Sequence, residues 1–223
     1  MTIAETPCLN NLWTDSIPVY EKILKLPFIQ ELTKGTLSIQ RFSYYMQQDA
    51  LYLIDFARAL SLIAAKANSA SDIISFIKYA EAAIVGEREL HAHYFTEYRI
   101  DPCAEKNCEC FAYTHYLIST VATRSLEEAI AAVLPCFWIY RDVGNHIYKH
   151  FESNNPYEKW IVHYADEEVS SVVDEALLIA ERMYEQASVF TQDAMRKMAL
   201  QSSVLEWRFW DAAYNRQNYV HML

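Results

Sequence analysis

Apolar residues recur every three or four positions along most of the chain, which is the period of an amphipathic helix. Short polar segments separate these stretches, and no repeat or low-complexity tract interrupts the series. The pattern predicts about eight helices, over residues 9–25, 28–33, 39–67, 71–98, 111–123, 125–151, 156–187 and 191–214. We therefore expect an all-α fold, with a single helical bundle that spans residues 1–223.

Several residues predict where these helices begin and end. Ser38 is a favourable N-cap, and Ser125 with Glu128 has the Ser-x-x-Glu spacing of a capping box. Thr191 is the expected N-cap of the last helix, and Gly35 suits the position that follows a helix end.

Pro135 lies inside the helix predicted over residues 125–151, directly before Cys136. Proline removes a backbone hydrogen bond and crowds the preceding turn, so it usually bends a helix. We expect a bend here that directs Cys136 and Tyr140 toward one side.

The composition supports an all-α fold. The 223 residues include only 3 glycines and 6 prolines, whereas folds with many turns use these residues heavily. Hydrophobic residues make up 52% of the chain, enough for a substantial core. An odd number of cysteines, 5, in a chain of this length is typical of free thiols in a reducing cytoplasm. Cys103, Cys108 and Cys110 lack paired zinc-site spacing and are interpreted as loop thiols.

The charge pattern argues against several classes of partner. The formal net charge is −10, and no run of Lys or Arg suggests binding to nucleic acid or to an anionic membrane. No stretch of 18 apolar residues predicts a membrane span. The first seven residues have neither the basic nor the apolar region of a signal peptide.

Two carboxylates stand in apolar stretches. Asp49 shares a predicted helix face with Tyr52, and Glu206 is flanked by large apolar side chains such as Trp207. A desolvated Glu206 would have a raised pKa, as a general acid needs near neutral pH. The residues alone leave two alternatives open: a hydrogen-bonded core Asp49, and a Glu206 that faces solvent and pairs with Arg208 or Arg196.

Cys136 and Tyr140 lie one helical turn apart and could combine a nucleophile with a phenol. Free cysteine is also among the residue types most often buried without chemical function. The local sequence therefore leaves an inert Cys136 open.

The histidines suggest a rival chemistry. Glu87, His91 and His93 are close in sequence, and His146 with His150 has a spacing that can hold a metal. Helical di-iron sites use Glu-x-x-His pairs, which do not occur here. We expect no metal and no cofactor, and keep a metal-dependent oxygenase as an alternative.

Five separated motifs resemble the TenA family, also called thiaminase II, which has a haem-oxygenase-like helical fold. The resemblance covers nearly the whole chain and is carried by residues 42–53, 113–116, 134–140, 160–168 and 206–210. Val169 replaces an aromatic residue frequent in the family, and the segment 103–110 has no counterpart in the family pattern. Cys136 places the chain with the cysteine-containing branch of the family.

The resemblance implies a role for each matching residue. Cys136 corresponds to the catalytic cysteine, Glu206 to the acid/base glutamate and Asp49 to the residue that binds the aminopyrimidine edge. The remaining matches are pocket aromatics that contact the substrate: Tyr52, Tyr113, Tyr140, Tyr164 and Phe209.

The implied activity is hydrolysis of 4-amino-5-aminomethyl-2-methylpyrimidine to the hydroxymethyl pyrimidine and ammonia, with thiamin as a possible second substrate. The resemblance also implies a homotetramer. A non-catalytic protein that binds the pyrimidine and regulates other processes remains an alternative.

Overall fold

Helices alone make up the regular structure of residues 9–216, which are the part of the chain described in this computed structural model. The side chains of residues 9–13 and of Glu87 are not described, and the segment examined above for a signal peptide also lies outside this range. The helices are α1 (Leu9–Leu24), α2 (Pro27–Thr33), α3 (Ile39–Lys66), α4 (Ala70–Glu97), α5 (Cys108–Thr123), α6 (Leu126–Tyr148), α7 (Glu158–Tyr164), α8 (Glu167–Gln186) and α9 (Val189–Asn215). The all-α prediction is confirmed.

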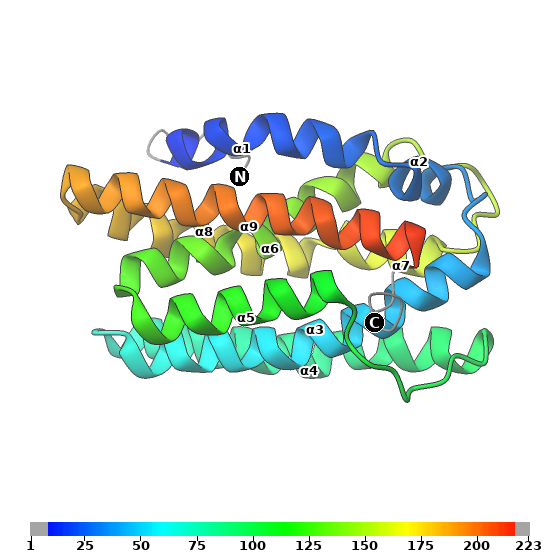
Figure 1. The fold of residues 1–223 in the computed structure, drawn as a ribbon, viewed down its shortest axis with the longest axis horizontal. Helices are drawn as coiled ribbons and strands as arrows, with labels where there is room; N and C mark the ends of the chain where they lie inside the picture. Colours follow the sequence, from blue (N-terminus) through cyan, green and yellow to red (C-terminus); the bar gives the residue numbers. More distant parts are fainter. Residues whose placement is uncertain (1–8, 217–223) are drawn as a thin grey trace.

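The long helices run along the longest axis of the molecule (Figure 1). Helix α9 packs on α1 on one side and on α6 on the other, while α3 pairs with α4 and also contacts α5. The short helices α2 and α7 lie toward one end of the bundle (Figure 1). Large aromatic side chains such as Trp138, Trp160 and Trp210 are fully buried between these layers.

The helix caps explain where most helices begin. Ser38 accepts a hydrogen bond from the Arg41 amide, and Ser125 forms the predicted capping box with Glu128. Gly35 has φ +66° after α2, as expected for its position. Helices α4 and α9 begin one and two residues before the predicted positions 71 and 191, because Ser69 and Ser188 provide the N-cap hydrogen bonds.

The helix predicted over residues 156–187 is two helices, so there are nine within residues 9–216 rather than eight. The chain turns after Tyr164, and the Asp166 side chain accepts a hydrogen bond from the Glu168 amide to begin α8. The spacing of apolar residues does not change at the break, because α7 and α8 each bury an apolar face against the core. Tyr164 of α7 and Val173 of α8 are both buried.

The prediction that Cys108 and Cys110 are loop thiols is wrong. Asn107 caps α5, so both cysteines lie in its first turn, and only Cys103 stays in the preceding loop. Cys110 is completely buried, and this burial raises the pKa of its thiol to about 12. Cys110 is therefore a core residue that stays protonated at neutral pH.

Helix α6 carries Pro135 and continues through it without interruption. The hydroxyl of Ser202 on α9 donates a 2.5 Å hydrogen bond to the Ala132 carbonyl, in the turn that the proline ring crowds. Farther along α6, Gly144 lies against α7, where a Cβ atom would be 2.6 Å from Cβ of Tyr164. Glycine at this position therefore lets α7 approach closely enough to bring Tyr164 to the interior.

Within residues 9–216, none of the helices has the length and apolar character needed to cross a membrane.

Candidate active site

A cavity of about 170 Å³ lies between α3, α4, α6, α7 and α8. Apolar side chains from α4 and α8 form much of its wall, including Ala83 and Val172. The residues on its wall that carry a polar or charged group are Asp49, Tyr52, Tyr79, Cys136, Tyr140, Arg141, His163 and Tyr164. Sites for drug-sized ligands usually measure about 300–1,000 Å³, so this cavity suits a single small ring.

Asp49 projects from α3 and is only 2% exposed. His91 of α4 donates a 2.9 Å hydrogen bond from Nε2 to Oδ2 of Asp49. A buried carboxylate is costly unless it is hydrogen bonded, and this contact supplies a partner. Asp49 therefore combines the two roles considered from the sequence: it is hydrogen bonded within the core, and it also reaches the cavity.

Glu206 projects from α9 and is 1% exposed. The Tyr113 hydroxyl donates a 2.7 Å hydrogen bond to its Oε1 atom. Burial raises the pKa of Glu206 to about 8; the Tyr113 hydrogen bond opposes this shift, and the charge of Asp49 adds to it. The solvent-facing alternative for Glu206 is therefore wrong, and Arg208 instead pairs with Glu109 at the surface.

Cys136 is a half-buried cysteine on the cavity wall, in the reduced form and beside the Tyr52 hydroxyl. Burial raises the pKa of Tyr52 well above its usual value, and the nearby groups of Cys136, Tyr113 and Glu206 raise it further. Burial also raises the pKa of Tyr113, and the neighbouring ionisable groups of Glu206 and Cys136 raise it further. The two tyrosines thus lie between the thiol and the buried carboxyl group and stay protonated at neutral pH.

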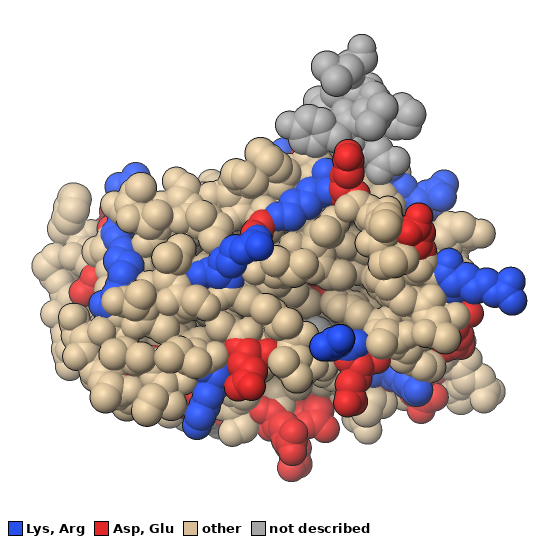
Figure 2. Space-filling model, turned by 90° about the horizontal axis from the view of Figure 1, so that it is seen from below, with Lys and Arg blue, Asp and Glu red and all other residues tan. Residues whose placement is uncertain are grey.

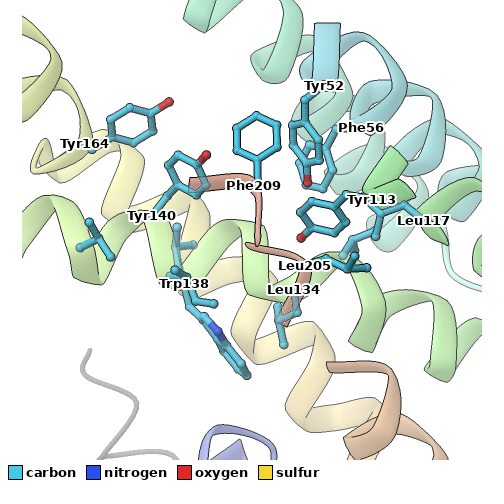
Figure 3. Close-up of a cluster of buried hydrophobic side chains, with 14 of the residues drawn as sticks. Tyr52, Phe56, Tyr113, Leu117, Leu134, Trp138, Tyr140, Tyr164, Leu205 and Phe209 are labelled. Atoms are coloured by element: carbon cyan, nitrogen blue, oxygen red, sulfur yellow. The ribbon is translucent and has the colours of Figure 1, made fainter. Parts of the chain in front are cut away.

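The aromatic residues suggested by the sequence occupy two layers. Tyr140 and Tyr164 line the cavity, with ring centroids 5.3 Å apart. Phe209 and Tyr113 lie in the next layer, with centroids 5.7 and 5.0 Å from that of Tyr52. Figure 3 shows Phe209 between Tyr140 and Tyr52. The second layer therefore packs behind the residues that line the cavity.

Sequence reasoning missed the role of His91 because its partner is 42 residues away on another helix. A carboxylate and a histidine on neighbouring predicted helices were the only available signal, and His91 was grouped with nearby Glu87 instead. His163 was missed for a similar reason, since nothing in its local pattern distinguishes a cavity residue from a surface residue.

The histidines considered as metal ligands are dispersed. His91 bonds to Asp49, His93 pairs with Glu97 at 2.8 Å, and His146 packs on His150 with centroids 4.6 Å apart. Among the side chains that the structure describes, no three His, Cys, Asp or Glu residues form a group that could hold a metal ion. Glu87 lies outside that comparison.

Comparisons with known proteins agree with this architecture. An "Aminopyrimidine aminohydrolase" of Halalkalibacterium halodurans is 32% identical over 214 residues, which cover 93% of this chain and 95% of that protein. The structure of a "TenA homologue protein" from P. horikoshii is 25% identical, with a TM-score of 0.84 over 93% of this chain and 98% of that one.

A third comparison, with a solved structure, identifies the fold. A domain from Shewanella denitrificans, described as having a heme oxygenase-like fold, superposes with a TM-score of 0.75 at 16% identity and covers 93% of this chain and 92% of its own. The expected haem-oxygenase-like fold is therefore confirmed. A model of the TENA/THI-4/PQQC family matches residues 16–216, and the chain belongs to this family.

Proposed function

We propose that this protein is a hydrolase of thiamin metabolism that converts 4-amino-5-aminomethyl-2-methylpyrimidine to the hydroxymethyl pyrimidine and ammonia. The observation that carries the proposal is a thiol on the wall of one small cavity with a buried acid in the layer behind that wall. Cys136 lines the cavity, and Glu206, whose pKa burial raises to about 8, accepts the Tyr113 hydrogen bond without lining the cavity itself. A relative that shares 32% identity over most of the chain has the name of this activity.

Substrate recognition would use the polar and aromatic walls of the cavity. Asp49, oriented by His91, would accept a hydrogen bond from the amino group on the pyrimidine ring. Tyr140 and Tyr164 would contact the ring itself, since aromatic rings pack favourably in offset or tilted arrangements. Asp49 would also help to activate the thiol, because both groups line the same cavity.

Chemistry would begin at the electron-poor ring. The sulfur of Cys136 forms a bond to the ring carbon next to the position that carries the aminomethyl group. Glu206 in its protonated form would pass a proton to a ring nitrogen by way of the Tyr113 and Tyr52 hydroxyls, so that the added electron pair ends on a neutral amine. This addition places electron density where it can expel the substituent on the exocyclic methylene.

The remaining steps return the enzyme to its starting state. The carbon–nitrogen bond of the aminomethyl group breaks as the ring nitrogen gives up its electron pair and the proton it received; the amine takes this proton and departs as ammonia. Water adds to the exposed methylene and loses a proton, which returns through the two tyrosine hydroxyls to Glu206, now a carboxylate. The carbon–sulfur bond then breaks, Cys136 is released, and the ring regains its aromaticity. The same route would cleave thiamin, with the thiazole as leaving group, and it requires no metal or cofactor.

The direct test is to incubate the purified protein with the aminomethyl pyrimidine and with thiamin, and to measure kcat/KM for each. We expect ammonia and the hydroxymethyl pyrimidine in equal amounts from the first substrate. The ratio of the two kcat/KM values identifies the preferred substrate. Tight binding of the pyrimidine without turnover would instead favour a binding or regulatory protein, and turnover that depends on bound iron would favour the oxygenase.

We also propose that the protein is a homotetramer. Ile74, Ile77 and Ile84 of α4 are each more than half exposed, and a groove between α3 and α4 includes Ile54 and Leu62. Figure 2 views this side of the molecule and shows wide areas without Lys, Arg, Asp or Glu. Exposed apolar surface of this kind often marks an interface between proteins.

Light scattering after gel filtration should give a mass four times that of the 26.0 kDa chain. Ile77→Glu should reduce that mass, because it places a charge in the apolar contact, while Glu21→Gln on α1 should leave the mass unchanged. A wild-type monomer at micromolar concentration would contradict the proposal.

We further propose that residues 1–223 act as one helical domain in the cytoplasm. The described helices share a continuous core. Each of the cysteines with a described side chain is in the reduced form rather than in a disulfide, as expected in a reducing compartment; these are Cys103, Cys108, Cys110 and Cys136.

A further inference from the structure

A second, wider hollow of about 680 Å³ adjoins the cavity. The two spaces share Gly86 of α4 and His163 of α7 among their lining residues, so these residues mark where one meets the other. The wider hollow, called the vestibule below, also includes Glu89 on α4 and Glu158 and Lys159 on α7. The cavity is thus mostly aromatic and apolar, whereas the vestibule adds three charged side chains, Glu89, Glu158 and Lys159, to an otherwise uncharged lining.

Gly86 is unusual because neither its backbone nor its packing requires glycine. It lies in the interior of α4 without a positive φ, where glycine is the least favourable residue after proline. A Cβ atom at Gly86 would find no heavy atom within 4 Å. At Gly144, in contrast, a Cβ atom would be only 2.6 Å from Tyr164 Cβ. Close packing therefore accounts for Gly144 but not for Gly86.

We propose that Gly86 is a specificity-determining residue that keeps the opening between the cavity and the vestibule wide enough for a ring attached to the pyrimidine methylene. This inference rests on the proposed function. A cavity of about 170 Å³ suits one small ring, so a substrate with two rings extends through the opening into the vestibule. An aminomethyl group needs no such space, because its leaving group is ammonia.

The charges of the vestibule match a cationic second ring such as the thiazolium of thiamin. Lys159 is held by His93, which itself pairs with Glu97, and Glu89 and Glu158 add two further acidic groups. These side chains are at the surface, where charge interactions are weak. The width of the opening, rather than these charges, is therefore the main determinant of which substituents enter.

The test replaces Gly86 by leucine and by alanine and measures binding and turnover with two ligands of different size. Relative to the values for the aminomethyl pyrimidine, Gly86→Leu should lower the kcat/KM for thiamin and raise its Kd by about 10-fold or more. Added methylene groups discriminate between substrates on this scale. Gly86→Ala should shift the ratio in the same direction by less, and should raise the Tm because alanine favours the helix. Val85→Leu is the matched control, because Val85 is exposed on α4 and lines neither space.

The outcomes separate this inference from the proposed function. An equal effect of Gly86→Leu on both ligands overturns the proposed role of Gly86. If the leucine variant does not fold, the same comparison of the two ligands with Gly86→Ala decides. If the wild type binds both ligands without turnover, and Gly86→Leu still weakens thiamin selectively, the hydrolase proposal fails while the role of Gly86 stands. If the wild type turns over normally and neither Gly86 variant weakens thiamin selectively, the hydrolase proposal stands and the role of Gly86 fails.

Discussion

Cys136→Ala is expected to abolish ammonia release from the aminomethyl pyrimidine while the protein stays folded. Removal of a covalent nucleophile lowers kcat by on the order of 10³-fold or more, because binding and orientation alone recover only part of the rate. The substitution removes one sulfur atom from the wall of an existing cavity, so little packing is lost. Turnover is measured by ammonia release and folding by the Tm.

Two variants make this result specific. Cys108→Ala changes another reduced, half-buried cysteine, in the first turn of α5, and should retain full activity. Cys136→Ser keeps a polar group of similar size, but a hydroxyl is a far weaker nucleophile than a thiol, so it should be nearly as inactive as alanine. Full turnover by Cys136→Ala would remove the nucleophile assignment and leave the cavity as a binding site.

The fold could be predicted from local features because each helix has its own signals. Ser125 and Glu128 are three residues apart, so the capping box is visible in the sequence and present in the structure. The break after Tyr164 was not predictable by the same reasoning, because the apolar period continues through it. Ser69 and Ser188 were missed because several nearby residues, such as Thr191, are equally suitable N-cap types.

The site was predictable only as a set of unusual residues. Asp49 and Glu206 stood out because each is a carboxylate in an apolar stretch, and both are buried. Their partners were not predictable, because the hydrogen bonds to His91 and from Tyr113 join helices that are far apart in sequence. The same limit explains why Tyr113 and Phe209 were expected to contact the substrate, although they pack behind the residues that line the cavity.

Glu206→Gln is expected to fold normally and to lose activity by about 10²–10⁴-fold, the usual contribution of general acid–base catalysis. Glutamine keeps an oxygen that can accept the hydrogen bond from Tyr113, so the local packing is preserved. It cannot transfer a proton to the ring nitrogen, because its amide does not ionise in this range. Asp211→Asn is the matched control, since it removes a carboxylate farther along α9 and should leave turnover unchanged.

The pH dependence tests the same assignment in a second way. Burial raises the pKa of Glu206 from 4.5 to about 8, so the protonated acid predominates at neutral pH and is lost as the pH rises through about 8. The kcat/KM of the wild type should therefore fall on the alkaline side with a midpoint near 8, and Glu206→Gln should lack this decrease. An alkaline limb that is identical in both proteins would contradict the acid role.

The contribution of Glu206 to stability should decrease as the pH rises, whereas that of an ordinary ion-paired carboxylate increases. Between pH 4.5 and about 8 the folded state holds a proton on Glu206 that the unfolded chain releases, so folding becomes less favourable as the pH rises through this window. Glutamine carries no such proton and removes this decrease. Relative to the wild type, the Tm of Glu206→Gln should therefore increase from pH 5 to pH 8, while that of Asp211→Asn should not. A glutamate that faced solvent would give no such difference, so the two pH profiles together identify Glu206 as a buried acid.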